Sequence, residues 1–340
     1  MADWNSTHGD IKKYIASEDE LWSLANYFFS DSCKKTSTYK FGFFKSIMDS
    51  TFSGEFTNRG YELTFQTLFS RFAENYWNLV TKYHLKQMRF NGSGEFSGLE
   101  LVFNSATSMS STIGNLEFIS LSEADRSRII SEIINKCKKN VVGALYGNFE
   151  GLFYGFDLKE KKIWLNPVAY EFVLKHKFEL DKLNYYAWAK YLEKINTDNV
   201  LVRVLDKLDE ATPRRNDLSV YREILRKEFE QDKCFYCGKS ISEKADVDHV
   251  IPWKLVREDR IWNFVLSCKK CNSKKNDRVP EKGLMIKVLD RNEKIIKDSH
   301  ALVIEEMKGY SAESMMRLWN YAKIGGYREY TVASSEKTCL

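Results

Sequence analysis

Two Cys-x-x-Cys pairs constrain the fold of this 340-residue chain more than any other feature. Cys234 and Cys237 form the first pair and Cys268 and Cys271 the second, whereas the other three cysteines stand alone. Four thiolates in a tetrahedron are the ligands that a structural Zn²⁺ prefers. The polar start of the chain has no basic region followed by an apolar one, so metal binding explains the pairs better than a disulfide framework. We therefore expect a structural zinc site, and incidental or buried thiols elsewhere.

The 30 residues between the two pairs exceed the roughly 15–20 of a plain zinc ribbon, so an element is inserted there. VDHVI alternates like a strand, NFVLS resembles a second strand, and CKKCNSKKND begins a helix that carries Cys271 and Asn272. Such a ββα unit is too small to be stable through apolar burial alone, so the zinc is expected to hold it together.

Asp248, His249 and Asn272 are expected to converge at one end of this unit. Carboxylate and amide oxygens suit Mg²⁺, and so few protein ligands leave positions for water and a phosphate oxygen. An imidazole with an ordinary pKa of ~6.5 can take a proton from water near neutral pH. The set predicts phosphodiester hydrolysis. The competing interpretation is a zinc ribbon in which Asp248 and His249 are ordinary surface residues, and the combination with Asn263, Asn272 and the basic helix argues against it.

The segment DVDHVIPWKLVREDRIWNFVLSCKKCNSKKNDRVP resembles the HNH endonuclease motif in its H-N-N form with paired zinc knuckles. It is also similar to the HNH nuclease domain of type II CRISPR effectors, which lacks the cysteines. The resemblance covers about Cys234 to Pro280 and implies a ββα-metal nuclease domain. It implies that His249 is the general base, and that Asp248 and Asn272 bind a catalytic Mg²⁺ or Mn²⁺. Asn272 in place of a final histidine favours these hard ions over a softer one.

Two further roles follow from the same resemblance. Asn263 would brace the loop and orient the histidine, and Lys275 would lie near the scissile strand. In the family mechanism His249 deprotonates a water while the metal stabilises the charge and the leaving 3′ oxygen. Products would carry 5′-phosphate and 3′-hydroxyl ends. One site cuts one strand, so a double-strand break would require two protomers or two binding events.

The net charge of +5 is mild, but Lys and Arg outnumber Asp and Glu between Lys233 and Arg278. A solvated face is the simplest explanation of such a cluster. Beside the proposed site, however, the cluster is expected to bind phosphates of DNA. Trp253 and Trp262 are expected to pack rather than to stack on bases. The candidate phosphate contacts are Lys254, Arg257, Lys269, Lys270, Lys274 and Lys275.

The rest of the sequence predicts a mainly α protein with a small α+β part. TFQTLFSRFAENYWNLVTKYHL carries an apolar helical stripe from Phe65 to Tyr83, and Ser122 with Asp125 predicts a helix start. Further helices are expected at 168–177, 181–195, 218–229, 280–298 and 311–322, with His84 and His176 inside helices and Pro213 breaking the chain. The expected domains are a helical regulatory or targeting domain at 1–229 with a hairpin near 151–166, the nuclease domain at 230–330, and a loose tail at 331–340.

The sequence does not decide the role of the helical domain at 1–229. The domain can select DNA, hold the nuclease inactive, form a homodimer or bind a regulatory protein. TSTYKFGFFKSIMDS resembles segments at the front of standalone bacterial HNH proteins, some of which are encoded with phage-defence or restriction functions. No run of 18 apolar residues occurs, so no membrane contact and a cytoplasmic location are expected. Two alternatives to a DNA endonuclease remain. They are an RNA-directed nuclease, although no RRM or KH signature occurs, and a non-catalytic zinc module that binds nucleic acid.

Overall fold

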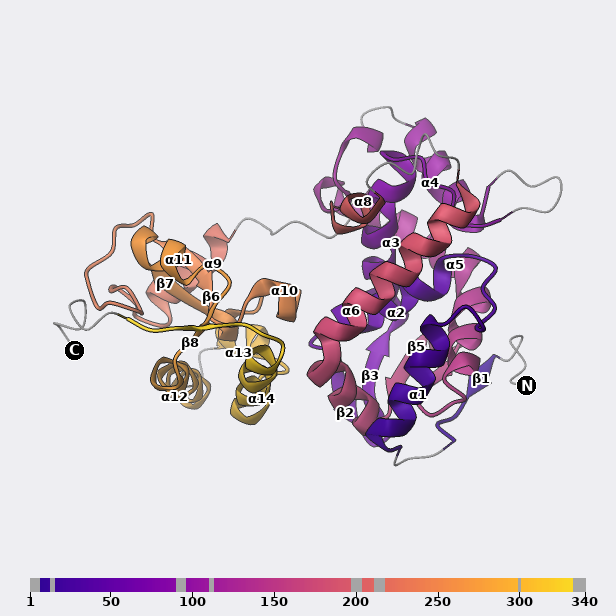
Figure 1. The fold of residues 1–340 in the computed structure, drawn as a ribbon. Coiled ribbons are helices and arrows are strands. Elements are labelled where there is room, and N and C mark those ends of the chain that lie inside the picture. The colour runs from indigo at the N-terminus through magenta and orange to yellow at the C-terminus, as the bar shows by residue number, and fades with distance from the viewer. Residues whose placement is uncertain are drawn as a thin grey trace. The chain divides into compact units, whose positions relative to one another are not determined.

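The computed structural model describes residues 7–12, 16–89, 96–109, 113–196, 204–210, 218–298 and 301–332. It divides into two compact units, Met1–Arg214 and Arg215–Leu340 (Figure 1). Helices dominate and the sheets are small, so the predicted class, mainly α with a small α+β part, is confirmed. No helix among the described residues is both long and apolar enough to span a membrane.

The first unit wraps helices around one antiparallel sheet. Its strands are β1 (His8–Gly9), β2 (Glu55–Thr57), β3 (Gly60–Thr64), β4 (Tyr154–Asp157) and β5 (Lys162–Leu165). Its helices are α1 (Glu18–Phe29), α2 (Tyr39–Asp49), α3 (Phe65–Thr81), α4 (Gly98–Met109), α5 (Glu123–Asn148), α6 (Pro167–Ile195) and α8 (Val204–Glu210), with short 3₁₀ turns at Ile113–Asn115 and Phe118–Ser120.

The sheet has the order β1-β4-β5-β3-β2 and is larger than the sequence predicted. The expected hairpin is present as β4 and β5, which pair from Tyr154–Leu165 to Asp157–Lys162. The remaining three strands were not predicted, since they are short, and β1 and β3 pair with strands distant in sequence, whereas β2 pairs with the neighbouring β3. Gly60 starts β3 with φ +129°, and a Cβ there would lie 2.2 Å from the Leu165 carbonyl oxygen, so this close strand approach requires glycine.

The apolar stripe predicted for α3 is buried from Phe65 to Val80. The helix ends at Thr81, so Tyr83 lies beyond it, and His84 is outside any helix with φ +52°. The placement of His84 inside a helix was therefore wrong. Ser122 caps α5 as predicted, because its Oγ accepts a hydrogen bond from the Asp125 backbone N–H at 3.1 Å.

α6 joins the two helices that were predicted at 168–177 and 181–195, and it packs along α1, α2 and α8 (Figure 1). Asn166 caps its start and Pro167 occupies the first turn, as expected. The two predicted helices are present, and they meet at a kink with non-helical backbone angles at His176. His176 is held there by Glu18, whose Oε1 lies 2.8 Å from its Nε2.

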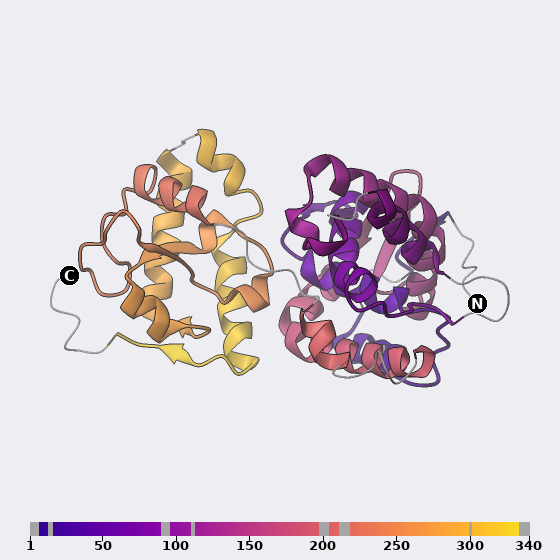
Figure 2. The ribbon, with the colours of Figure 1, turned by 90° about the horizontal axis from the view of Figure 1, so that it is seen from above.

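The second unit contains the two cysteine pairs. Its elements are α9 (Ser219–Lys227), β6 (Asp246–His249), α10 (Trp253–Val256), a 3₁₀ turn at Ile261–Asn263, β7 (Phe264–Ser267), α11 (Lys269–Lys275), β8 (Val279–Pro280), α12 (Lys282–Asp298), α13 (Ala301–Glu306), α14 (Ala312–Ile324) and β9 (Glu329–Tyr330). β6 and β7 form one antiparallel pair, and β8 and β9 a parallel pair that was not predicted. α12 and α14 pack side by side (Figure 2).

The division between the units falls at Arg214–Arg215, earlier than the expected boundary at 229–230. The difference is α9, which packs on β6 and β7 and therefore belongs to the second unit. Arg222 Nε donates a hydrogen bond to the Ala245 carbonyl at 2.7 Å, and the Tyr221 ring lies 4.8 Å from that of Phe264. Pro213 and residues 333–340 of the expected tail, with Cys339, lie outside the described residues.

Candidate functional site

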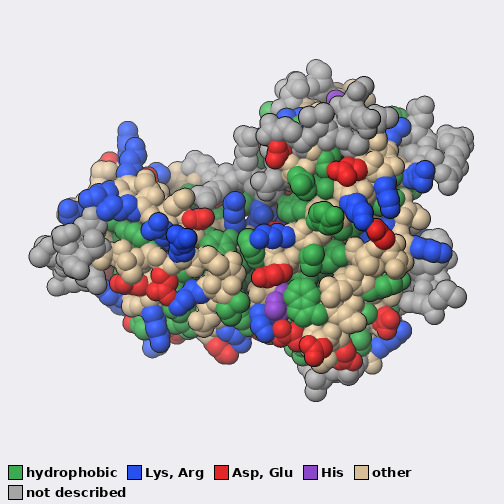
Figure 3. Space-filling view, viewed as in Figure 1, with side chains coloured by type: hydrophobic (Ala, Val, Ile, Leu, Met, Phe, Trp, Pro, Cys, Tyr) green, Lys and Arg blue, Asp and Glu red, His purple; other side chains and the backbone are tan. Residues whose placement is uncertain are grey.

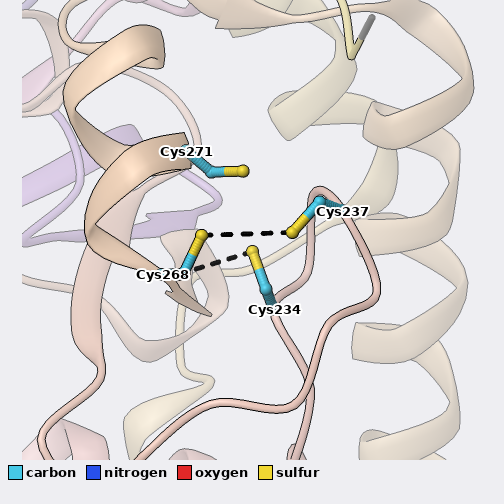
Figure 4. Close-up of side chains that lie close together, drawn as sticks. All are labelled: Cys234, Cys237, Cys268 and Cys271. Carbon is cyan, nitrogen blue, oxygen red and sulfur yellow. Dashed lines mark hydrogen bonds between the residues drawn. The ribbon is translucent and has the colours of Figure 1, made fainter. Parts of the chain in front are cut away.

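The four cysteines of the two pairs lie together. Their sulfur atoms are all within 4.8 Å of one another, and Figure 4 shows them pointing toward a common centre. Cys237 Sγ is 3.9 Å from Cys268 Sγ, and the Cys268 backbone N–H donates to Cys234 Sγ at 3.4 Å. The ends of the insert are therefore brought together by residues 31 positions apart, as the spacing predicted.

This donor set fits zinc. A Zn–S distance of ~2.3 Å separates the sulfurs of a tetrahedral site by about 3.8 Å, close to the Cys237–Cys268 separation. Burial raises the pKa of the Cys234 and Cys271 thiols. Burial opposes the charge of Cys268 too, but hydrogen bonds from the Cys271 backbone and the neighbouring thiols outweigh it and lower its pKa. Buried thiols of this kind become thiolates when a divalent cation compensates their charge, so the four-cysteine cluster suggests a structural zinc site.

The predicted ββα unit is present. β6 and β7 pair in the register Asp246–Ser267 to His249–Phe264, and Cys268 is the residue directly before α11, which carries Cys271 and Asn272. The Asp-His pair thus stands at the end of β6, where the strand leaves the sheet. All the residues predicted to act in chemistry lie within this unit.

Asn263 holds the loop that follows His249. Its side chain is fully buried, its Oδ1 accepts from the Ile251 N–H at 2.8 Å, and its Nδ2 donates to the Ile251 carbonyl at 2.9 Å. Its own carbonyl accepts from the Val250 N–H at 2.8 Å. One amide side chain therefore pairs both polar groups of a loop residue, which is the bracing geometry expected for the middle asparagine.

Asp248 is buried and lies among polar partners. The hydroxyl of Tyr236 donates to Oδ2, and the ammonium of the fully buried Lys275 lies 3.1 Å from the same oxygen. Lys275 also donates to the His249 carbonyl at 2.5 Å. Burial raises the pKa of the Tyr236 hydroxyl well above its usual value, with the Asp248 charge adding to the effect, so this hydroxyl stays a donor. Lys275 Nζ also lies 3.4 Å from Oδ1, and because a carboxylate has about four acceptor positions, Oδ1 keeps further acceptor capacity.

Asn272 is half-buried on α11, and its Nδ2 donates to Asp246 Oδ2 at 3.1 Å. Since the amide nitrogen is engaged with a carboxylate, the amide oxygen is the atom that can accept a cation. Asp246 and Asp248 point to the same face of β6, because they are two residues apart in a strand. α11 lies across that face and supplies Asn272 to one carboxylate and Lys275 to the other.

His249, the residue after Asp248 and the last of β6, is buried and by strand alternation points to the other face, so the convergence of Asp248, His249 and Asn272 on one spot stays a prediction. His249 Nε2 lies 3.1 Å from Asp259 Oδ1, and the two side chains are 4% and 7% exposed. Its ring meets the ring of Phe264, its direct cross-strand partner, edge to face at 4.6 Å. The imidazole is thus fixed by a carboxylate and an aromatic ring.

The open edge of β7 is satisfied by side chains. Gln231 both donates to the Leu266 carbonyl and accepts from its N–H, each at 2.9 Å. Arg291 from α12 donates to the Phe264 carbonyl at 2.6 Å, and its burial lowers its pKa to about 10. Asn292 donates to the Trp262 carbonyl at 2.9 Å. A two-stranded sheet is marginal alone, and these bonds supply partners that further strands would otherwise give.

The six candidate phosphate contacts divide into two groups. Lys254, Lys269, Lys270 and Lys274 are exposed. Arg257 is 8% exposed with its guanidinium 5.2 Å from the Trp253 ring centre, and Lys275 is fully buried against Asp248. The second unit carries clusters of Lys and Arg on the face drawn in Figure 3. Trp253 and Trp262 are both buried, as expected of packing residues.

Three residues of the site were missed by sequence reasoning: Tyr236, Asp246 and Asp259. Asp246 was detectable, since it stands two residues before Asp248 in an alternating strand and so shares its face. Tyr236 lies inside the first knuckle and Asp259 in a charged loop, and only the folded chain brings them to the site.

Comparison with known proteins bears on the same segment. Residues 234–278 match the family model of the HNH endonuclease. No curated protein matches the chain, and no solved structure does. The matched segment contains the cysteine cluster, both strands of the ββα unit and α11. This second-unit segment is an HNH endonuclease domain, which indicates a nuclease that acts on nucleic acid.

Proposed function

We propose, from the HNH endonuclease domain at residues 234–278, that this chain is a metal-dependent endonuclease that hydrolyses phosphodiester bonds of DNA, one strand per site. The observation that carries the proposal is the end of β6. There Asp248 and His249 lie in the ββα unit that carries the four-cysteine cluster. Asn263 hydrogen-bonds to Ile251 in the loop that follows His249, and α11 packs on β6. A non-catalytic zinc module has no need of this buried polar arrangement, which is costly to bury.

Asp248 and Asn272 would hold the catalytic cation, Mg²⁺ or Mn²⁺. The chemistry of their oxygens fits a hard divalent ion, and both atoms keep acceptor capacity in the structure. Such a cation, when bound, stabilises the charge that develops on the phosphate and the leaving 3′ oxygen. Lys275 holds the Asp248 carboxylate in place and neutralises it within the fold.

His249 would take the proton from the attacking water, since it is the imidazole adjacent to the carboxylate ligand. Asn263 fixes the loop that follows His249 through its two hydrogen bonds to Ile251. The exposed Lys254, Lys269, Lys270 and Lys274 would bind backbone phosphates, whereas Arg257 is engaged in packing on Trp253. The products would be 5′-phosphate and 3′-hydroxyl ends.

The test uses purified zinc-loaded chain with supercoiled plasmid and, separately, a structured RNA, in Mg²⁺, in Mn²⁺ or in EDTA. We expect nicked circles in either metal and none in EDTA, and at least a 10²-fold slower rate for His249→Ala. His84→Ala, which changes an exposed histidine of the first unit, is the matched control and should keep the wild-type rate. Equal metal-dependent nicking by wild type and His249→Ala would refute His249 as the base. Cleavage of RNA alone would replace DNA as the substrate, and no cleavage of either would favour the non-catalytic module.

The first unit would supply targeting or control of this nuclease. Its part in phage defence or restriction is a prediction that rests on the resemblance of TSTYKFGFFKSIMDS to the front of other HNH proteins. Most of that segment forms α2, whose residues are buried in the unit's core. The resemblance therefore concerns the scaffold of the unit, and contacts with a homodimer partner or a regulatory protein must come from other residues.

A further inference from the structure

We propose that Asp259 is the positioning residue of the active site: it holds His249 as the Nε2–H tautomer, so that Nδ1 carries the lone pair that accepts the proton of the attacking water. This inference rests on the proposed nuclease function for its catalytic consequence. Its structural part, the tautomer of His249, stands on the geometry alone.

The contact itself has the required chemistry. His249 Nε2 and Asp259 Oδ1 are 3.1 Å apart, and both side chains are almost completely buried, at 4% and 7% exposure. A carboxylate can only accept a hydrogen bond, so the proton of this bond belongs to Nε2. In a neutral imidazole the other ring nitrogen, Nδ1, then bears the lone pair.

The fold delivers Asp259 to this position by a defined turn. α10 ends at Val256, and the next residue, Arg257, adopts a left-handed conformation with φ +61° and donates its N–H to the Trp253 carbonyl at 2.7 Å. The left-handed residue turns the chain, and Asp259, two residues later, lies beside Nε2 of the imidazole. The Tyr221 hydroxyl of α9 donates to the Asp259 carbonyl at 3.2 Å and so fixes its backbone.

Aromatic packing closes the arrangement from the other side. The Phe264 ring contacts His249 at 4.6 Å, and the Tyr221 ring contacts Phe264 at 4.8 Å. The imidazole therefore lies between one carboxylate and one ring, and both are held by Tyr221. This packing restricts rotation of the imidazole. Loss of the Asp259 carboxylate is therefore expected to change which ring nitrogen carries the proton and to leave the position of the ring nearly unchanged.

The expected catalytic role is that of a carboxylate behind a basic imidazole. Such a group selects the tautomer and stabilises the imidazolium that forms when the water proton is taken, without itself touching the substrate. In the known case of a serine protease, replacing this carboxylate by an amide lowers kcat by about 10⁴ through the wrong tautomer. For Asp259→Asn we expect a fall in single-turnover cleavage rate of about 10²–10⁴, with Asp259→Glu recovering part of it.

The deciding measurement does not need activity. The chain has five histidines, so ¹⁵N-histidine-labelled, zinc-loaded full-length protein gives a small set of ring-nitrogen signals. Spectra of the His249→Ala variant assign the His249 pair, under mildly alkaline conditions in which an ordinary imidazole is neutral. We expect a protonated Nε2 and an unprotonated Nδ1 in the wild type, and a shift toward the other tautomer or a mixture in Asp259→Asn. Asp232→Asn, which changes an exposed carboxylate of the same unit, should leave the spectrum and the rate unchanged.

The outcomes separate the two proposals. A protonated Nδ1 in the wild type, or a tautomer that does not change in Asp259→Asn, overturns the inference whether or not the protein is a nuclease. The expected tautomers in a protein that cuts neither DNA nor RNA support the structural assignment and refute the nuclease proposal instead. If Asp259→Asn unfolds the unit, seen as loss of the amide pattern, Asp259→Glu carries the test, since it keeps the carboxylate and should keep the wild-type tautomer.

Discussion

The core of the first unit is built from aromatic side chains. The ββα part of the second unit instead contains the cysteine cluster and many hydrogen bonds from side chains to the backbone. Phe44, for example, stacks on Phe149 at 5.6 Å and lies 5.8 Å from Phe153, all fully buried. Around β6 and β7, by contrast, the buried positions include Asp248 and His249, whose polar side chains do not stabilise the core by apolar packing. The comparison shows how a chain can keep a polar site inside a small fold.

The physical reason is a conflict over buried positions. Charged and polar groups cost free energy when they leave water, and a two-stranded sheet offers few apolar contacts to offset that cost. In the second unit every one of these groups has a fixed partner: Lys275 for Asp248, Asp259 for His249, and Ile251 for Asn263. Zinc bound by the cysteine cluster would supply the stability that apolar burial does not.

Removing zinc should produce the largest difference between the two units. Structural zinc in finger domains contributes about 10–16 kcal/mol to folding at pH 7, so a strong chelator or Cys268→Ser should unfold the ββα unit. The first unit has none of the cluster cysteines and should stay folded. Hydrogen exchange measured by mass spectrometry on the full chain, peptide by peptide, distinguishes the two.

Cys33→Ser is the matched control for that experiment, because Cys33 is a buried thiol of the first unit outside the cluster. It should retain bound zinc and the protection of residues 246–275. A Cys268→Ser protein that lacks zinc and keeps full protection there would contradict the structural role of the metal and remove the basis of the comparison.

A deletion in the aromatic core should have the second largest effect, in the first unit alone. Phe44→Ala removes a fully buried ring from α2 and leaves a cavity between Phe28, Phe149 and Phe153, which should cost about 3–5 kcal/mol. Tyr186→Ala, at 65% exposure, should cost less than about 0.5 kcal/mol. The measurement is the denaturant midpoint of the first unit, followed by hydrogen exchange at α2. Equal midpoints for the two variants would show that aromatic packing does not dominate this unit.

The sequence predicted those parts of the fold and of the site that depend on neighbouring residues. The Cys-x-x-Cys pairs, the alternation of VDHVI and the capping by Ser122 and Asn166 are local signals, and the structure contains the corresponding elements. The meeting of the two Cys-x-x-Cys pairs across the 30-residue insert was also predictable, because four ligands of one metal have to lie close together.

The remainder depends on contacts between distant segments. β1 and β3 are short, and they pair with β4 and β5, which are distant from them in the sequence. α6 continues through His176 because Glu18 of α1 and the packed rings of Trp22 and Phe172 support the kink. Asp259 was missed for the same reason: no spacing rule links position 259 to 249, and only the turn at Arg257 does so.

The smallest predicted effect concerns a single amide, Asn263. Asn263→Ala removes both bonds to Ile251 and leaves a buried N–H and C=O unpaired, which should cost about 2–3 kcal/mol in the zinc-loaded protein. Asn263→Asp keeps an acceptor for the N–H, but it loses the donor and buries a charge, so it should be at least as damaging. Faster hydrogen exchange at Val250 and Ile251 reports the loss directly, and Ser273→Ala on the exposed face of α11 is the neutral reference. Unchanged exchange at these amides in Asn263→Ala would mean that the two hydrogen bonds from Asn263 to Ile251 do not hold the loop. The zinc cluster alone would then account for the order of the site, and the polar bonds would follow from the fold without stabilising it.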